Sequence, residues 1–142
     1  MKIFYKTRAT ATGGRAGHTA LDDGGLALDL AVPGSGKPGA NPEQLFALGY
    51  AACFDNALAG VAKQMDLPIT GSRTSAEVGI GQTAAGGYAL DIYLWIEIQG
   101  LGEAEGMTLV EATHRVCPYS NATQGNIDVR LHVTVDQGDQ TA

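Results

Sequence analysis

Residues 45–54, LFALGYAACF, are the stretch that most constrains how this 142-residue chain can fold. They lie inside a helix predicted over 42–65, with Asn41 as its N-cap and Pro42 at its first position. The stretch carries no charged side chain on any face, and its small residues allow another backbone to approach closely. A helix that is apolar all round has to be enclosed on every side. Because one small sheet covers a single side, we expect a second copy of the chain to cover the rest, in an obligate homodimer.

Alternating segments bounded by turn residues flank this helix and predict short strands. Three strands are expected before it, over 1–11, 17–23 and 25–32. Three more are expected after it, over 74–82, 88–99 and 126–135. A second helix, over 107–117, is expected to end at Pro118, which turns the chain toward the last strand. This element order predicts an α+β fold with antiparallel sheets, in a single domain spanning residues 1–142.

Two of the expected strands have one clearly apolar face. In the strand over 88–99 this face is formed by Tyr88, Leu90, Ile92, Leu94, Ile96 and Ile98. In the last strand it is formed by Ile127, Val129, Leu131, Val133 and Val135. We expect both faces to point toward the helices and to form the core with them.

Composition excludes several classes of function. A net charge of −6 without any basic cluster argues against binding of nucleic acids, which requires a positively charged face. The opening residues, MKIFYKTRATATGG, contain no apolar signal-peptide core, and the uncharged stretch 45–54 is far shorter than the ~20 residues of a membrane span. We therefore expect a soluble cytoplasmic protein that has no membrane partner.

The chain has two cysteines, Cys53 within the apolar helix and Cys117 at the end of the second helix. In a reducing cytoplasm they are inert core thiols, metal ligands or redox groups. A metal site formed by His114 with the two cysteines lacks the paired spacings of zinc motifs. Apolar burial raises the pKa of a thiol and makes it unreactive, so a redox role requires an activating charge nearby.

Two charged residues are candidates for that activation. Glu43 lies in the first turn of the apolar helix. Arg15 lies in the glycine-flanked turn GGRAG, where an arginine side chain can fold inward. Considered locally, an arginine in such a turn is more often a solvated loop residue.

Three segments together resemble a known family. GANPEQLFALGYAACF (39–54) and HRVCPYSNATQGNIDV (114–129) closely resemble motifs of the organic hydroperoxide resistance (Ohr) proteins, a branch of the OsmC/Ohr family, and ATATGGRAG (9–17) resembles the same branch. The likeness extends through almost the whole chain in order. The chain departs from the family pattern at Ala40, usually threonine, and at Gln124, usually arginine. The departure at Gln124 puts in doubt any surface contact that the usual arginine makes, such as contact with a reductant.

The resemblance implies an OsmC/Ohr-like fold in which antiparallel sheets wrap around two central helices in an intertwined homodimer. It implies a thiol peroxidase, an organic hydroperoxide reductase of the peroxiredoxin-like class, with no cofactor and no metal. Cys53 matches the peroxidatic cysteine and Cys117 the resolving one, while Arg15 matches the activating arginine and Glu43 the carboxylate that holds it. The implied reaction reduces alkyl or fatty-acid hydroperoxides to alcohols through a Cys53 sulfenic acid and a Cys53–Cys117 disulfide. A dithiol, expected to be a lipoylated protein, reduces that disulfide.

Helix geometry adds an expectation about the site. Glu43 and Cys53 are ten positions apart, or about 15 Å along an ideal helix axis. Two antiparallel copies that cross near Leu48 would bring Glu43 of one chain level with Cys53 of the other. We therefore expect two active sites per dimer, each shared by both chains.

Other residues near the cysteines have several interpretations. Phe46, Leu48, Tyr50, Phe54 and Tyr119 are expected to line an apolar entrance that favours organic hydroperoxides. His114, one helical turn before Cys117, can contact its thiol, donate a proton to it or interact favourably with the helix C-terminus.

Two alternative functions remain at this level. One is an OsmC-branch peroxidase of broader peroxide range. The other is a non-catalytic dimeric module that binds a lipid-like ligand in its apolar cleft. The joint presence of both cysteines, Arg15 and Glu43 speaks against the second.

Overall fold

The computed structural model describes residues 1–138 and divides into two compact units, Met1–Leu45 and a second unit that begins at Phe46. Each unit contains one three-stranded sheet. The expected α+β class is confirmed by this arrangement of three α-helices and two sheets within the described residues.

The first unit is built on an antiparallel meander of β1 (Ala9–Thr12), β2 (His18–Leu21) and β3 (Ala27–Asp29). The expected strand over 1–11 begins only at Ala9. The register gives the reason, because Ala9 pairs with Leu21 and β2 ends there, at the turn before β3. The Thr10 hydroxyl of β1 donates a hydrogen bond of 2.7 Å to the carboxylate of Asp22, the residue after β2.

Helix α1 (Pro42–Gln64) starts in the first unit and continues through the second. Its predicted cap is present, since Asn41 and Gln44 exchange side chain-to-backbone hydrogen bonds of 2.9 Å in both directions. One face of the helix is buried, while Leu48 on another face is 69% exposed. By length and apolar composition alone, α1 could also cross a membrane, but the core helix of a soluble protein has the same properties.

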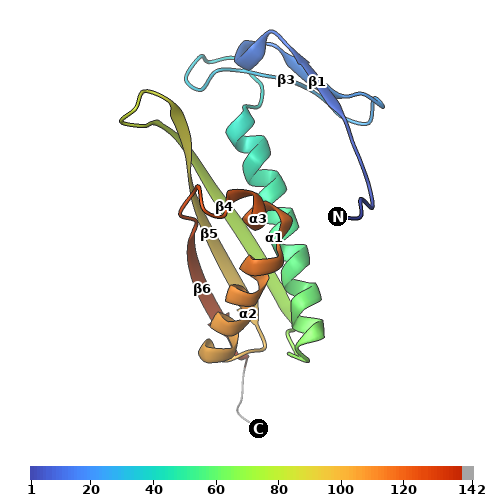
Figure 1. Cartoon of the computed structure of the whole chain (residues 1–142), viewed down its shortest axis with the longest axis vertical. Coiled ribbons are helices and arrows are strands. Elements are labelled where there is room, and N and C mark those ends of the chain that lie inside the picture. The colour runs from blue at the N-terminus through green and yellow to red at the C-terminus, as the bar shows by residue number, and fades with distance from the viewer. Residues whose placement is uncertain (139–142) are drawn as a thin grey trace. The chain divides into compact units, whose positions relative to one another are not determined.

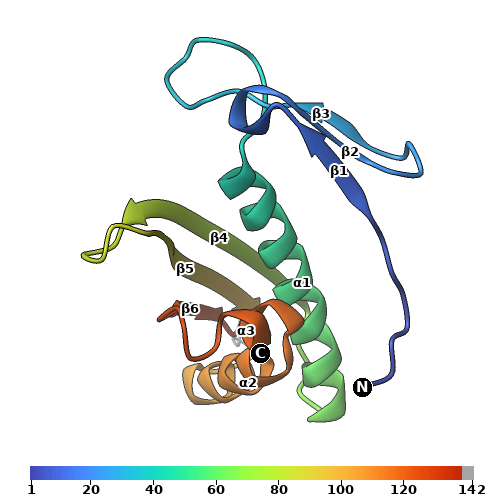
Figure 2. The same cartoon turned by 45° about the horizontal axis from the view of Figure 1, so that its top comes forward.

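The sheet of the second unit contains β4 (Gly71–Gln82), β5 (Tyr88–Gln99) and β6 (Arg130–Asp136). The long β4–β5 hairpin is antiparallel, as predicted. The expectation of purely antiparallel sheets is wrong for β6, which runs parallel to β5. The chain leaves one end of β5, crosses the sheet through helices and re-enters at the opposite end, which forces a parallel pairing. Figures 1 and 2 show these helices and α1 on the same face of the sheet.

The crossover consists of two helices where the sequence predicted one. Helix α2 (Glu103–Val116) begins four residues earlier than expected, and a short helix α3 (Pro118–Thr123) follows Pro118. Glu103 and Glu105 favour the early start because acidic side chains stabilise a helix N-terminus. Gly106 fits there because a Cβ at this position would press on the Val135 side chain of β6.

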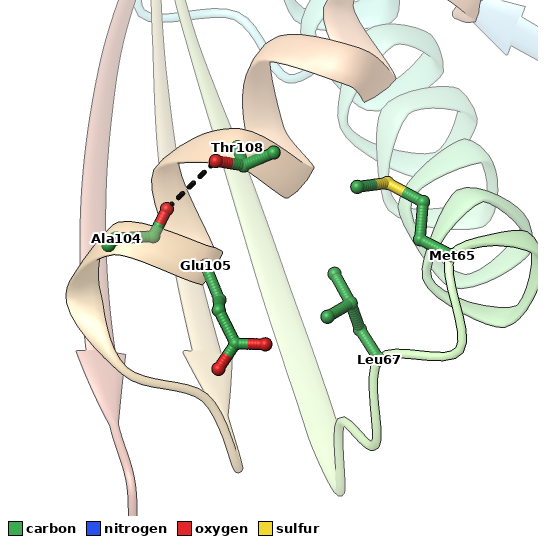
Figure 3. A pocket seen from close by; sticks show the side chains of 5 residues that line it. All are labelled: Met65, Leu67, Ala104, Glu105 and Thr108. Atoms are coloured by element: carbon green, nitrogen blue, oxygen red, sulfur yellow. Dashed lines mark hydrogen bonds between the residues drawn. The ribbon is translucent and has the colours of Figure 1, made fainter.

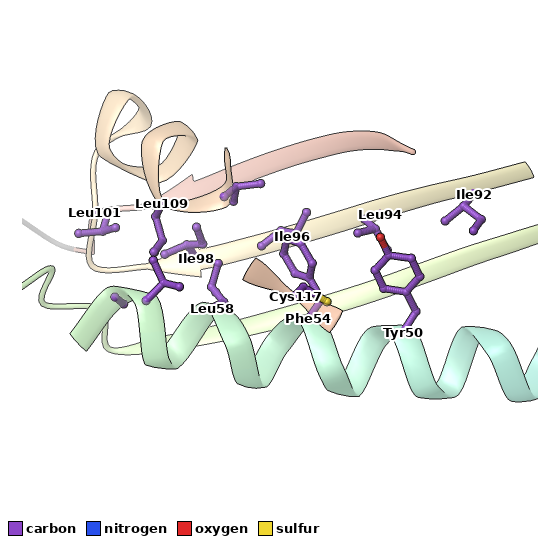
Figure 4. Packing of buried hydrophobic residues seen from close by; sticks show 13 residues of the cluster. Tyr50, Phe54, Leu58, Ile92, Leu94, Ile96, Ile98, Leu101, Leu109 and Cys117 are labelled. Atoms are coloured by element: carbon purple, nitrogen blue, oxygen red, sulfur yellow. The ribbon is translucent and has the colours of Figure 1, made fainter. Parts of the chain in front are cut away.

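The core of the second unit lies between the helices and the sheet (Figure 4). Tyr50, Phe54 and Leu58 of α1 are fully buried against β5, whose Ile92, Leu94, Ile96 and Ile98 are buried as predicted. Tyr88 was expected on the same face but is 76% exposed, because it lies at the turn end of the hairpin, opposite Gln82. The apolar face of β6 is partly buried in the predicted alternation.

Candidate functional site

The second unit brings Cys53 and Cys117 together. Cys53 of α1 is partly buried and Cys117 is completely buried, and both are free thiols. Their Sγ atoms are 4.0 Å apart. A disulfide requires about 2.05 Å, so a closure of about 2 Å would join them.

Cys117 occupies the junction between α2 and α3. Its backbone N–H donates to the carbonyl of Thr113 and ends α2, while its own carbonyl accepts from Asn121 in α3. Its backbone is extended, with φ −60° and ψ 126°. The second helix ends before Pro118, as predicted, but the expected turn toward the last strand is wrong, because α3 follows. Proline at the first position of a helix lacks only an N–H that has no helical partner there, so Pro118 starts α3 and fixes Cys117 between two helices.

The described surroundings of Cys53 in this unit raise the pKa of its thiol. Burial raises the pKa of Cys53, and the neighbouring Cys117 raises it further, while a hydrogen bond from the Tyr119 backbone opposes both effects. The net result is a raised pKa, which keeps the thiol protonated at neutral pH.

Arg15 and Glu43, the two predicted charged residues, form a bidentate pair in the first unit. Nη1 and Nη2 of Arg15 donate to the two carboxylate oxygens of Glu43 at 2.8 and 2.5 Å. The turn that presents Arg15 (Gly14–Ala16, a single turn of 3-10 helix) follows from its glycines, because Gly13 and Gly14 both have positive φ. This geometry matches the fork of a guanidinium to a carboxylate.

The two partners differ in exposure. The Glu43 side chain is 12% exposed and the Arg15 side chain 44%. The hydrogen bond from Arg15 lowers the pKa of Glu43, and the hydrogen bond to Glu43 raises the pKa of Arg15. Both groups are therefore ionised at neutral pH, and the exposed part of the guanidinium remains available to a further acceptor.

An aromatic cluster lies beside the thiols. The rings of Phe46, Tyr50 and Tyr119 meet edge-on or tilted, with centroids 5.5 to 6.2 Å apart. The prediction that Tyr50 and Phe54 line an entrance is wrong, since both are fully buried in the core. Phe46 and Tyr119 are half-buried and pack against that core.

Three side chains near the thiols, Tyr50, Ser120 and His114, form a hydrogen-bonded chain. The hydroxyl of Ser120 is 2.7 Å from the Tyr50 hydroxyl and 2.8 Å from Nδ1 of His114. His114 therefore bonds to Ser120 of α3. Burial raises the pKa of Tyr50 and lowers that of His114. Sequence analysis missed Ser120, whose only sequence signal is its position one helical turn after Cys117.

Two depressions in the second unit lie near these helices. One, of about 370 Å³, is lined by His114, Arg115, Ser120 and Gln124. The other, of about 300 Å³, lies at the far end of α1 and is lined by Met65, Leu67, Ala104, Glu105 and Thr108 (Figure 3). Among residues 1–138, no three His, Cys, Asp or Glu side chains are grouped so that they could hold a metal ion.

Comparison with known proteins gives consistent matches. The family model described as OsmC-like protein matches residues 34–132. An organic hydroperoxide resistance protein from Xanthomonas axonopodis pv. citri is 49% identical over 135 residues, covering 92% of this chain and 94% of the relative. OhrB of Bacillus subtilis is 42% identical over 134 residues, covering 92% of this chain and 98% of the relative.

Solved structures agree with these matches. The crystal structure of an organic hydroperoxide resistance protein from Legionella pneumophila has a TM-score of 0.89 and 45% identity, covering 94% of this chain and 100% of that one. A similar protein from Vibrio cholerae, with captopril bound in one of the active sites, has a TM-score of 0.88 and 43% identity, covering 98% of this chain and 96% of that one. The chain therefore belongs to the OsmC-like protein family and, within it, to the organic hydroperoxide resistance (Ohr) branch.

Proposed function

We propose that this protein is a thiol peroxidase that reduces organic hydroperoxides to alcohols, with Cys53 as the attacking thiol and Cys117 as the resolving thiol. The observation that carries the proposal is the 4.0 Å distance between the two Sγ atoms in a member of the Ohr branch. The relatives are organic hydroperoxide resistance proteins, which supports peroxidase-type chemistry. The residue roles and the catalytic cycle are our proposal.

The first step oxidises Cys53. Its thiolate attacks the distal oxygen of the hydroperoxide, an S–O bond forms, and the O–O bond breaks. The alkoxide that leaves takes up a proton and departs as the alcohol. The sulfur loses two electrons and becomes a sulfenic acid.

The second step closes the disulfide. The sulfur of Cys117 attacks the sulfenic sulfur of Cys53, the S–O bond breaks, and hydroxide leaves with the Cys117 proton as water. A dithiol then reduces the disulfide by two exchange reactions and is itself oxidised to a disulfide. A lipoylated protein suits this role because it offers two thiols on one flexible arm.

Activation of Cys53 is assigned to Arg15, held by Glu43. Burial raises the pKa of Cys53, so a fixed cation is needed to form the thiolate at neutral pH. Arginine suits a poorly hydrated position because it stays charged and binds two acceptors at once. Glu43 uses both of its oxygens on Arg15, which orients the guanidinium and balances its charge.

We assign the active form to a homodimer in which each site takes Cys53 and Cys117 from one chain and Arg15 and Glu43 from the other. The exposed Leu48 and Ala52 on the uncharged part of α1 support this, since they leave apolar surface uncovered in the single chain. The Vibrio cholerae relative has more than one active site, which agrees with two sites per dimer. In this proposal the chain works as a single domain over residues 1–142 in the cytoplasm.

The deciding experiment measures consumption of cumene hydroperoxide and of hydrogen peroxide by the reduced protein, with dihydrolipoamide as the dithiol donor. We expect rapid turnover of the organic peroxide, slower turnover of hydrogen peroxide and no turnover by Cys53→Ser. Equal, slow consumption by the wild type and by Cys53→Ser would overturn the proposal. The protein should then be screened for a lipid-like ligand.

A further inference from the structure

The hydrogen-bonded chain of Tyr50, Ser120 and His114 joins the same three helices that carry the two thiols. Tyr50 is on α1, His114 on α2 and Ser120 on α3. Tyr50 precedes Cys53 by three residues, His114 precedes Cys117 by three, and Ser120 follows Cys117 by three. Residues three apart on a helix lie on the same face. The polar chain therefore runs alongside the thiol pair.

The hydrogen-bonded Tyr50–Ser120–His114 chain lies in the protein interior. Tyr50 is fully buried and Ser120 is 2% exposed. Among the described residues no buried side-chain nitrogen or oxygen lacks a hydrogen-bond partner. The Ser120 hydroxyl has one proton and two acceptor lone pairs, so it can bond to both neighbours at once. Loss of either neighbour would remove one of the two side-chain hydrogen bonds of Ser120.

The direct link between the two thiols is weak. Their sulfurs are 4.0 Å apart, and a thiol is a weak hydrogen-bond donor. A further link is the hydrogen bond between the Tyr119 backbone and Cys53. The two bonds of Ser120, at 2.7 and 2.8 Å, are short and well defined by comparison. Because α3 begins directly after Cys117, the position of Ser120 also determines the position of Cys117.

We propose that His114 is a positioning residue for disulfide formation: through Ser120 and Tyr50 it holds Cys117 facing Cys53, so that the disulfide closes quickly. The proposal rests on the proposed function, in which this closure is a catalytic step. His114 touches neither the peroxide nor the reacting sulfurs in this assignment. Its contribution belongs to closure and not to the attack on the peroxide.

A consequence concerns protection of the enzyme. A Cys53 sulfenic acid that waits for Cys117 can react with a second hydroperoxide and become a sulfinic acid, which a dithiol does not reduce. Fast closure prevents this loss. Variants that lack a bond of the Tyr50–Ser120–His114 chain should therefore form Cys53 sulfinic acid at hydroperoxide concentrations at which the wild type does not.

The test separates attack from closure by means of a small aromatic disulfide, 5,5′-dithiobis(2-nitrobenzoate). The Cys53 thiolate breaks its S–S bond, forms a mixed disulfide and releases one thionitrobenzoate. Cys117 then attacks the Cys53 sulfur, the Cys53–Cys117 bond forms, and a second thionitrobenzoate leaves. The second release reports closure alone, and it requires no peroxidase activity. Failure of this inference is thus distinguishable from failure of the proposed function.

Four variants are compared with the wild type. His114→Leu removes one bond of the chain, Tyr50→Phe removes the other, and Ser120→Ala removes both. His114→Asn is the matched control, since an asparagine side chain offers a polar atom at the position of Nδ1. Thermal unfolding of each variant verifies that it is folded, and Tyr50→Phe retains the ring that fills the core.

We expect the second release to slow by about tenfold to a hundredfold in His114→Leu and Ser120→Ala, as for a reacting group displaced by about 1 Å. The first release should change less than about twofold, and His114→Asn should restore most of the closure rate. The same variants should accumulate Cys53 sulfinic acid in excess cumene hydroperoxide, as measured by mass spectrometry. Unchanged closure in His114→Leu and Ser120→Ala would overturn the inference, as would equal slowing of both releases in all four variants.

Discussion

The hydroxyl of Tyr119 lies so close to Gly49 that a Cβ at Gly49 would collide with it. The missing side chain on α1 thus makes room for a residue two positions after Cys117. The backbone of Tyr119 also forms a hydrogen bond with Cys53, and its ring packs on Tyr50 and Phe46. The contact between Gly49 and Tyr119 therefore helps to set how closely α3 and Cys117 approach Cys53.

Gly49→Ala should force Tyr119 and the start of α3 away from α1. We expect a loss of about 1–3 kcal/mol in the free energy of unfolding, typical of overpacking, together with slower disulfide formation. The matched control is Gly60→Ala on the same helix, where a Cβ meets nothing within 4 Å. That change should stabilise the protein by about 0.5–1 kcal/mol, since alanine favours helix. Urea unfolding monitored by circular dichroism measures both, and equal effects at the two positions would contradict the packing role of Gly49.

Cys117→Ser should separate the two halves of the catalytic cycle. With Cys53 intact, we expect the reduced variant to consume one equivalent of cumene hydroperoxide at nearly the wild-type rate. Without a resolving thiol, turnover with dihydrolipoamide should fall by at least about tenfold, and the Cys53 sulfenic acid should be trapped by dimedone. Peroxide assays measure the consumption and turnover of cumene hydroperoxide, and mass spectrometry detects the dimedone-trapped sulfenic acid. Wild-type turnover in Cys117→Ser would show that the buried thiol is only part of the core.

Arg15→Ala should change the pH dependence of the attack on hydroperoxide. Burial raises the pKa of Cys53, so without a nearby cation the thiolate forms only as the pH rises through that raised value. The attack rate of the variant should therefore keep increasing across the alkaline range, whereas the wild-type rate should level off at lower pH. Near pH 7 we expect a deficit of at least about tenfold, corresponding to about 1.4 kcal/mol or one pKa unit, which narrows as the pH increases.

Stopped-flow measurement of the first thiol lost, from pH 5 to 10 in steps, gives both profiles. Arg8→Ala is a suitable control, because Arg8 also pairs with a carboxylate, Asp22, in the first unit. Its profile should match that of the wild type. Parallel profiles for Arg15→Ala and wild type would contradict the activating role.

Mixed dimers should show whether the site is shared. In a dimer of one Arg15→Ala chain and one Cys53→Ser chain, a shared site combines the intact Cys53 of the first with the intact Arg15 of the second. Near pH 7 we expect the Cys53→Ser homodimer to be inactive and the Arg15→Ala homodimer to have at most about a tenth of wild-type activity. The mixed dimer should regain about half of the wild-type activity. Co-expression with two different tags isolates the mixed dimer, and its peroxide turnover is then measured. A site built within one chain predicts no recovery, because neither chain then carries both residues.

Several features of this protein could be predicted from local sequence patterns. The Asn41 cap and the start of α1, the buried alternation from Ile92 to Ile98 and the α+β class depend on residues that are neighbours in sequence, and all are confirmed. The Ohr branch was recognised from motifs around Cys53 and Cys117, and the relatives support it. The catalytic roles of Cys53, Cys117, Arg15 and Glu43 remain predictions.

The tertiary structure decided what depends on residues far apart in the chain. β6 is parallel to β5 because the crossover returns over one face of the sheet, a choice that no periodicity in either strand encodes. Serine is usually found at the protein surface. Packing of α3 between α1 and α2 nevertheless buries Ser120 between Tyr50 and His114. Sequence by itself thus determined the elements and the chemical groups, while long-range packing determined which of those groups meet, because contacts between distant segments form only when the chain folds.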